Sequence, residues 1–522
     1  MPARIAAAAL VATLLGATVA CSPAAPGPSA AGPPAEEAGG ISQAQVDAGL
    51  TMIDGVVEAE MKATGVPGVA VGVVFADRTA FTKGYGVREI SKAGAVDPGT
   101  VFQIASLSKP VGSTALAALV GKGKFAWDDP VHRFLPELAF SDPYVTEHVT
   151  FADLYAHRSG LPGLTGNRLE EIGFDRATIL ERIRYAPLDP FRATYSYSNY
   201  GMTAAGEAAG RAAGTTFEDV MQQELFGPAG MTSSSARSAD FRARPDRATQ
   251  HIRVNGAWQV GPGRDPDAQA PAGGISSTVE DLARWMRLNL RDGTLDGHPI
   301  VDADALAETH TPHILRMPAS GTDSIGGFYG LGWNVEVDHF GFVRWAHSGA
   351  FSTGAATTAV LLPKAGFGVV VLTNGSPIGA AETIADIVVD DVVKGAPTRD
   401  WNKVWSERFG GLFVADPKLA APPPNAVPAR PATAYTGTCT NPYYGAFTVR
   451  ADAEGLALIE GPAGHTYPLT HWSGDSFTMV ESPELPDIRT QVTFTVGPDG
   501  RATSLDVGGQ PGVNVLTCTA AA

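Results

Sequence analysis

The chain has 522 residues, more than one hydrophobic core usually serves, so two domains with additional tails are expected. Hydrophobic residues make up 44% and charged residues 18% of the chain, a composition that excludes a disordered or fibrous protein. The formal charge is 38 − 54 = −16 and no run of clustered Lys and Arg occurs, which argues against a nucleic-acid-binding surface.

The first 21 residues have the pattern of a targeting segment. Arg4 supplies a positive end, and residues 5–20 form a run of apolar and small side chains. This run is shorter than the ~20 apolar residues that a membrane-spanning helix needs. We therefore expect a cleaved export signal over residues 1–21.

The end of this segment also suggests a lipid anchor. Residues 18–21, Thr-Val-Ala-Cys, resemble a bacterial lipobox, in which Cys21 becomes the lipidated residue, although Thr18 stands where Leu is usual. Ordinary cleavage near Ala20 is the alternative. Residues 22–40 are rich in Pro, Ala and Gly, which predicts a flexible tether after the anchor.

A helix and a β-hairpin are predicted next. Ser42 and Gln45 have the spacing of a capping box, and residues 46–63 after them have the pattern of an amphipathic helix. Residues 68–75 and 79–87 are rich in Val and aromatic residues and predict a β-hairpin.

The stretch 105–110, Ala-Ser-Leu-Ser-Lys-Pro, places the Ser106 hydroxyl three residues before the Lys109 amine at the start of a predicted helix. Residues three apart on a helix face each other. An amine in this position can prepare a serine hydroxyl, which is too weak a nucleophile alone. For this motif in isolation, a helix cap with a solvated lysine is the simpler interpretation.

The rest of the first domain is predicted to be helical in the middle and β at its end. Residues 123–230 are mostly helical in pattern, and a further helix over 279–290 has Thr278 as its cap. Four strands are predicted at residues 329–337, 343–347, 357–362 and 368–373. The order indicates an α+β fold, in which an antiparallel sheet with strands from both ends of the domain is flanked by helices and joined to an all-helical subdomain.

We place this first domain at residues 41–398, a linker at 399–432 and a second domain at 433–522. The linker carries a Pro-rich segment, and the last domain has short alternating runs typical of a small all-β barrel or sandwich. Because export implies an oxidising compartment, Cys439 and Cys518 are expected to pair, with two separately buried thiols as the alternative. Closing this loop would stabilise the domain by ~4 kcal/mol.

Three short motifs follow one another along the chain: Ser106-x-x-Lys109, Tyr197-Ser198-Asn199 and His347-Ser348-Gly349. Their order resembles that of the serine β-lactamases and penicillin-binding proteins, especially class C β-lactamases, D,D-carboxypeptidases of serine type and related esterases. Further segments similar to the family's motifs lie at residues 154–162, 228–231 and 273–277. The resemblance covers roughly residues 41–395, and the last domain resembles the lipocalin-like domain appended to many such hydrolases.

The resemblance implies a role for each motif residue. Ser106 would attack the substrate carbonyl, and Lys109, its pKa lowered by desolvation, would accept the proton. Tyr197 would share this proton transfer and later activate the hydrolytic water. Asn199 would hydrogen-bond the substrate amide or Lys109, and the backbone amides of Ser106 and Ala350 would form the oxyanion hole.

The third motif departs from the β-lactamases, because His347 stands where lysine is most frequent. Histidine titrates near neutral pH, so its hold on a substrate carboxylate is expected to be weaker than that of lysine and pH-dependent. This departure weakens the case for efficient β-lactam hydrolysis. Gly349 is expected to line the substrate site beside it. Two simpler interpretations remain: His347 packs beside Trp345, and His157 holds a loop by hydrogen bonding.

The sequence thus predicts an exported serine hydrolase, periplasmic or held at the cell envelope as a lipoprotein. It would cleave amide or ester bonds in a β-lactam, a D-amino-acid peptide or a short ester. A non-hydrolytic sensor or binding protein for β-lactams or peptidoglycan stems is the alternative. We expect no cofactor and no metal, since His310 and His313 lack the spacing of a zinc site. The expected partners are a small-molecule or peptide substrate and, through Cys21, the membrane; the oligomeric state is not indicated.

Overall fold

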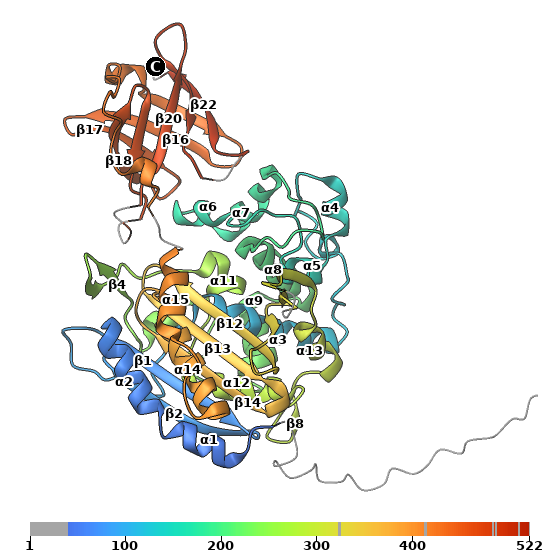
Figure 1. Ribbon diagram of the computed structural model, residues 1–522. Coiled ribbons are helices and arrows are strands. Elements are labelled where there is room, and N and C mark those ends of the chain that lie inside the picture. Colours follow the sequence, from blue (N-terminus) through green and yellow to red (C-terminus); the bar gives the residue numbers. More distant parts are fainter. Residues whose placement is uncertain are drawn as a thin grey trace, which may run out of the picture.

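The computed structural model describes residues 40–321, 325–411, 415–482, 485, 488–509 and 512–520. They form an α+β domain and a closed β-barrel, which lies at one end of it, above α6 and α7 (Figure 1). The expected export signal, Cys21 and nearly all of the expected tether lie outside the described residues.

The α+β domain is built on one antiparallel sheet. Its strand order is β2-β1-β14-β13-β12-β11-β10-β9, so strands from the two ends of the domain pair in the middle of the sheet, as predicted. The strands are β1 (Gly68–Phe75), β2 (Arg78–Gly86), β9 (Ile314–Met317), β10 (Gly327–Tyr329), β11 (Asn334–Val337), β12 (Val343–Phe351), β13 (Ala355–Leu362) and β14 (Phe367–Thr373).

The central strands are buried along their whole length. Every residue of β1, β13 and β14 is buried, which explains why these segments are continuous apolar runs without polar alternation. One face packs on α1 (Gln43–Leu50), α2 (Ile53–Thr64) and α14 (Ala380–Lys394), and α15 (Trp401–Gly410) covers α14 (Figure 1). The other face packs on α12 (Val279–Leu290), and the domain is therefore three layers deep.

Helices α3 (Ser108–Gly121) and α8 (Asn199–Ala213) are central to the helical part of the domain, and both contact α11 (Ala270–Gly273). The remaining helices are α4 (Pro143–His148), α5 (Phe151–Tyr155), α6 (Asn167–Glu171), α7 (Arg176–Arg182), α9 (Phe217–Val220), α10 (Ser238–Ala243) and α13 (Ala303–His310). Short strand pairs complete the domain: β3 (Phe102–Gln103) with β6 (Ser276–Ser277), β4 (His251–Val254) with β5 (Ala257–Val260), and β7 (Thr294–Leu295) with β8 (His298–Pro299).

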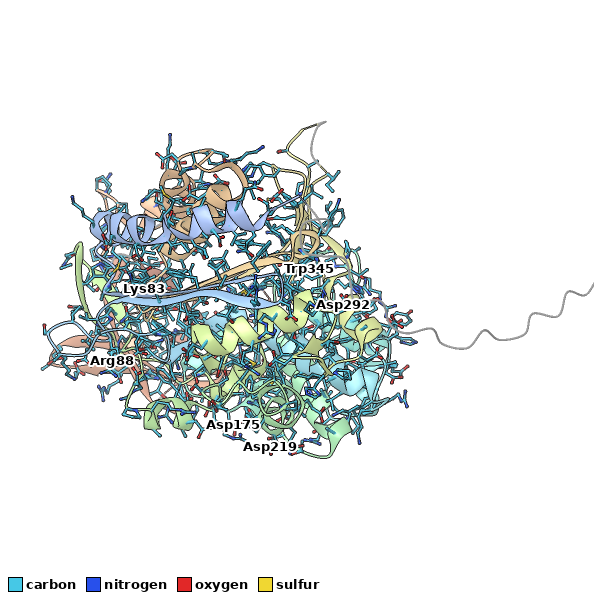
Figure 2. All side chains as sticks on the ribbon, turned by 90° about the horizontal axis from the view of Figure 1, so that it is seen from below. Lys83, Arg88, Asp175, Asp219, Asp292 and Trp345 are labelled. Atoms are coloured by element: carbon cyan, nitrogen blue, oxygen red, sulfur yellow. A yellow bond between two sulfur atoms is a disulfide. The ribbon has the colours of Figure 1, made fainter. Side chains whose placement is uncertain are left out.

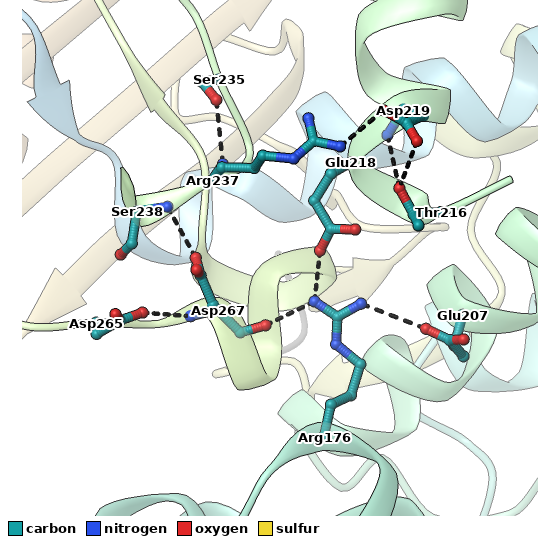
Figure 3. A network of polar contacts seen from close by, with 10 residues as sticks. All are labelled: Arg176, Glu207, Thr216, Glu218, Asp219, Ser235, Arg237, Ser238, Asp265 and Asp267. Atoms are coloured by element: carbon teal, nitrogen blue, oxygen red, sulfur yellow. Dashed lines mark hydrogen bonds and ion pairs between the residues drawn. The ribbon is translucent and has the colours of Figure 1, made fainter. Parts of the chain in front are cut away.

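A polar network around Arg176 joins the helices of this region (Figure 3). The Arg176 guanidinium on α7 donates to the Glu218 carboxylate at 2.5 Å, to the Asp267 carbonyl at 2.6 Å and to the Glu207 carboxylate at 3.3 Å. Nearby, Arg237 pairs with Asp219 at 2.7 Å. These contacts satisfy the buried guanidinium from three separate elements and fix their relative positions.

Two predicted elements are each divided in the structure. The helix predicted over 46–63 is two helices, because the chain turns at Thr51 and each half packs separately on α14. The strand predicted over 329–337 is the hairpin β10–β11, whose turn contains Gly332 at φ +92°. A Cβ there would lie 3.0 Å from the Lys109 carbonyl oxygen, so the close approach of this turn to α3 favours glycine.

The predicted capping box, first hairpin and capped helix over 279–290 are present. In the predicted linker, residues 399–432, α15 occupies the first part, before the Pro-rich segment. Its indole N–H groups fix it to α14: Trp401 donates to Asp390 at 2.7 Å and Trp405 donates to Asp386 at 2.8 Å.

The second domain confirms the predicted all-β architecture. Its closed barrel has the strands β15 (Gly437–Asn441), β16 (Gly445–Asp452), β17 (Gly455–Glu460), β18 (His465–Ser473), β19 (Ser476–Met479), β20 (Thr490–Val496), β21 (Ala502–Asp506) and β22 (Val515–Ala520). Cys439 and Cys518 are joined by a disulfide between the first and last strands, which are neighbours in the closed barrel.

The barrel contacts the larger domain at α6. The Gly166 N–H donates to the Tyr443 hydroxyl at 2.8 Å, and the Arg182 guanidinium donates to the Tyr443 carbonyl at 3.0 Å. Arg168 of α6 forms an ion pair with the buried Glu460 of the barrel. These contacts hold the barrel against α6, whose first residue, Asn167, contacts Asn199.

Charged side chains such as Lys83 and Asp175 lie at the periphery of the larger domain (Figure 2).

Among the helices of the described residues, none combines the length and apolar character that crossing a membrane would require.

Candidate active site

Ser106 lies in a short 3-10 turn, residues 105–107, between β3 and α3. Ala105 before it has φ +48°, a conformation that non-glycine residues rarely adopt. The Ala105 side chain is fully buried against Phe351 and Ala355 of the sheet. Packing therefore holds the backbone in this conformation and places Ser106 at the N-terminal end of the helix, as the sequence predicted.

Lys109 makes three polar contacts inside the site. Its side chain is fully buried, and its Nζ lies 3.0 Å from Ser106 Oγ, 2.8 Å from Asn199 Oδ1 and 2.8 Å from the Ala272 carbonyl oxygen. The Ser106–Lys109 spacing thus brings the hydroxyl and the amine into contact, as predicted.

Burial lowers the pKa of Lys109 well below its ordinary value, because the charged form is desolvated. A neutral amine has two N–H donors and one lone pair. The Ala272 carbonyl and the Asn199 Oδ1 can only accept, so they take the two N–H groups. The lone pair is left facing the Ser106 hydroxyl, which is the arrangement of a general base.

Tyr197 lies just before α8, where Ser198 caps the helix by accepting from the Gly201 N–H. The Tyr197 hydroxyl faces the Ser106 hydroxyl, and the Tyr197 ring centroid lies 4.6 Å from Lys109 Nζ. Burial raises the pKa of Tyr197 above its ordinary value. Tyr197 therefore keeps its phenolic proton, and burial favours the neutral form of Lys109.

His157 supports Tyr197 from behind. Its Nδ1 accepts the backbone N–H of Ser198 at 3.1 Å, and its ring centroid lies 4.4 Å from that of Tyr197. Burial lowers the pKa of His157 well below its ordinary value. This geometry agrees with the interpretation that His157 holds a loop by hydrogen bonding.

Asn199 is held by a residue that the sequence did not single out. Its Oδ1 faces Lys109, and its Nδ2 donates to Asn167 Oδ1 on α6 at 3.3 Å. Asn167 therefore fixes which end of the Asn199 amide faces the lysine. The Ala272 carbonyl was also missed, although the motif at 273–277 was recognised next to it.

Strand β12 carries the third motif, residues 347–349, past the turn that holds Ser106. A Cβ on Gly349 would lie 2.1 Å from the Ile104 carbonyl oxygen and 2.9 Å from the Leu107 nitrogen, so only glycine lets the strand pass this close to the Ser106 turn. Ala350, the next residue, is exposed, and His347 is buried.

The expectation that His347 titrates near neutral pH is wrong. Burial, which penalises the charged imidazolium, lowers the pKa of His347 to about 3. Its Nδ1 lies 2.7 Å from the Ser348 carbonyl, which can only accept, so Nδ1 carries the proton. Nε2 then accepts from the Tyr329 hydroxyl at 2.9 Å. His347 is therefore neutral and offers no positive charge to a substrate carboxylate.

Among the residues that the structure describes, no group of three or more His, Cys, Asp or Glu side chains is placed to hold a metal ion. The site consists of a serine, a lysine and a tyrosine at the end of a helix beside an antiparallel sheet, which is the arrangement of the β-lactamase and penicillin-binding-protein class.

The chain belongs to the β-lactamase family. The family's sequence model matches residues 53–394, more than half of the chain, and residues 421–515 match a domain of unknown function, DUF3471. The chain is 27% identical over 478 residues to unguisins hydrolase ungD' of Aspergillus campestris, covering 85% of this chain and 87% of that protein. It is 26% identical to penicillin-binding protein 4 of Amycolatopsis lactamdurans over 373 residues, 69% of this chain and 89% of that one.

Solved structures share the fold. The octameric penicillin-binding protein homologue from Pyrococcus abyssi has a TM-score of 0.60 at 20% identity, covering 90% of this chain and all of that one. EstCE1, a hydrolase with promiscuous acyltransferase activity, has a TM-score of 0.57 at 18% identity, covering 67% of this chain and all of that one.

Proposed function

We propose that the protein is a serine hydrolase that forms an acyl-enzyme on Ser106. The observation that carries this proposal is the position of Lys109, whose neutral amine directs its lone pair at the Ser106 hydroxyl. Hydrolase-named relatives such as unguisins hydrolase support the same reaction class.

In the acylation step Ser106 Oγ attacks the substrate carbonyl carbon while its proton passes to Lys109 Nζ. The backbone N–H groups of Ser106 and Ala350 stabilise the oxyanion, aided by the start of α3. As the bond to the leaving group breaks, the leaving atom takes the proton from the Lys109 ammonium through the Tyr197 hydroxyl, which contacts Ser106.

Deacylation reverses these transfers. Water attacks the acyl carbonyl while its proton passes through the Tyr197 hydroxyl to the Lys109 amine, and Ser106 Oγ regains a proton from the Lys109 ammonium as the acid product leaves. Asn199 holds the acyl amide and orients Lys109.

The absence of charge on His347 bears on which substrates are preferred. A β-lactam is usually held by its carboxylate, and His347 supplies no charge for it. We therefore propose that short esters, and D-amino-acid peptides without a carboxylate beside the scissile bond, are better substrates than β-lactams.

A side-by-side rate measurement tests this function. A chromogenic cephalosporin, a D-Ala-D-Ala peptide and a p-nitrophenyl ester are each offered to the wild type, to Ser106→Ala and to Ser113→Ala. Ser113 is the matched control, because its buried hydroxyl lies on the same helix without a hydrogen-bond partner among the described residues. We expect Ser106→Ala to abolish turnover and Ser113→Ala to retain it; full activity in Ser106→Ala contradicts the proposal. A long-lived adduct without product release indicates the sensor alternative instead.

We also propose that the protein is exported and anchored through a lipid on Cys21. The motivation is the apolar run of residues 5–20 that ends at a cysteine followed by a Pro-rich segment. We expect the expressed wild type to incorporate a radioactive fatty acid. The Cys21→Ala variant should still be exported but should carry no label. Unlabelled wild-type protein contradicts the anchor.

A further inference from the structure

The cavity between the barrel and α6 is lined by more carboxylates than cations. It has a volume of about 480 Å³, with Leu164, Tyr444, Phe447 and Met479 among the residues that line it. Its charged residues are Arg168 and Glu171 of α6 and Glu460 and Glu481 of the barrel domain.

Arg168 is the single cation of this group. Its guanidinium pairs with Glu460, lies 3.1 Å from Glu481 and lies 3.6 Å from Glu171. With all three carboxylates ionised the formal charge is −3 + 1 = −2. Arg264 is not among the residues that line the cavity and is paired with Glu170 at 2.8 Å.

The Glu460 carboxylate has only one of its two oxygens paired. Its side chain is 1% exposed, Oε2 binds Arg168, and Oε1 has no hydrogen-bond partner among the described residues. A buried carboxylate oxygen without a donor is costly. Burial raises the pKa of Glu460 to about 7 in spite of Arg168, which agrees with a site that lacks one positive charge.

The cavity adjoins the proposed active site. Asn167 lines the cavity and accepts the hydrogen bond from Asn199, which in turn contacts Lys109. Gly163, also in the cavity wall, lies against the Tyr197 carbonyl, since a Cβ on it would be 3.5 Å from that oxygen. Leu164 is 67% exposed and has φ +68°, a strained backbone that holds an apolar side chain at the cavity.

We infer that this cavity is a substrate subsite for an acyl group that carries an ammonium at the end of an apolar chain. The inference rests on the proposed function, in which Asn199 holds the acyl amide; an acyl side chain passing Asn167 enters the cavity. The methylene groups pack on Leu164 and Phe447, and the ammonium donates to Glu460, Glu481 and Glu171, completing the charge balance.

Two substrates that differ only at the ammonium test this inference. The p-nitrophenyl esters of Nα-acetyl-D-lysine and Nα-acetyl-D-norleucine have side chains of the same carbon number. For the wild type we expect kcat/KM to be about tenfold higher for the lysine ester. The ratio is expected to fall at least about threefold in Glu481→Gln and in Glu171→Gln, with the norleucine ester unaffected.

Glu147→Gln is the matched control, since Glu147 is an exposed carboxylate on α4 outside the cavity, and it should keep the wild-type ratio. Glu481 and Glu171 are partly exposed, so their variants are expected to fold even if Glu460→Gln does not. A wild-type ratio near one, or a ratio unchanged in both variants, overturns the subsite. If Ser106→Ala still cleaves both esters, the proposed function fails instead, whatever the ratio.

Discussion

The active site and the interface between α6 and the barrel treat buried cations in opposite ways. At the site, burial lowers the pKa of Lys109 and of His347 and so favours their neutral forms, because both can give up a proton. At the interface Arg168 keeps its charge, and neighbouring carboxylates raise its pKa. Desolvation thus turns a buried lysine, which can lose its proton, into a base. A buried arginine cannot lose its proton, so it must be paired with carboxylates instead.

The largest expected effect comes from Lys109→Met, which keeps the volume of the side chain and removes the amine. Loss of a general base should lower kcat/KM for the p-nitrophenyl ester by on the order of 10³-fold. The melting temperature should also fall, because Asn199 Oδ1 and the buried Ala272 carbonyl oxygen lose their donor. Lys124→Met, which changes an exposed lysine, is the control. A variant that keeps more than a tenth of the activity would remove Lys109 as the base.

Removing the charge at the interface should instead cost stability. Arg168→Met leaves the buried Glu460 without its ion-pair partner and should lower the free energy of unfolding of the barrel by about 3 kcal/mol at pH 8. The loss should shrink below pH 7, because Glu460, with its raised pKa of about 7, is then protonated and leaves no buried charge.

Arg176→Met provides the comparison for this experiment. Arg176 has the same exposed side-chain fraction as Arg168, 18%, but its contacts lie within the larger domain. Its loss should therefore shift the unfolding transition of that domain. Denaturant unfolding followed domain by domain separates the two, and equal destabilisation of the barrel by both variants would contradict the assignment.

Asn167 connects the two regions and acts as a positioning residue. Asn167→Ala frees the Asn199 amide and should lower kcat/KM about tenfold, because Lys109 loses its fixed orientation. Asn167→Asp still accepts the Asn199 N–H and should restore most of the rate.

The pH profile separates positioning from a loss of folding. The added carboxylate of Asn167→Asp favours protonated Lys109, so its pKa rises. Since the base must be neutral, activity is lost as the pH falls through this pKa, and the acid limb should move to higher pH. An unchanged limb together with an unrescued rate would reduce Asn167 to a structural role.

The last prediction is that His347 causes no pH dependence of kcat/KM near neutral pH. His347, with its pKa lowered to about 3, should contribute no limb between pH 5.5 and 8 to kcat/KM. Comparing a substrate with a carboxylate and its amide over this range checks this. A limb near pH 6.5 that appears only with the carboxylate would show that His347 titrates as an ordinary histidine.

Local patterns predicted most of the architecture and the motif residues. Apolar runs and caps placed the sheet strands and the helix over 279–290, and the Ser106–Lys109 spacing brought two functional groups together because helix geometry is regular. The break between α1 and α2 was not predictable, since it depends on how each half packs on α14.

The protonation of His347 was also beyond the sequence, because it follows from burial by strands and rings distant in the chain. The role of Asn167 has the same origin: it lies 32 positions before Asn199, in a helix of five residues, and only the fold brings the two amides together. The contrast between a neutral site and a charged interface therefore emerges at the level of packing.

The most direct test of the account is the site of acylation. The wild type is mixed with the p-nitrophenyl ester, quenched in acid within its turnover time, digested and measured by mass spectrometry. The account predicts one acyl group on the peptide that contains Ser106, which disappears as product forms and is absent from Ser106→Ala. Acyl transfer to another residue, or full turnover with no adduct in the variant that lacks the serine, would contradict it.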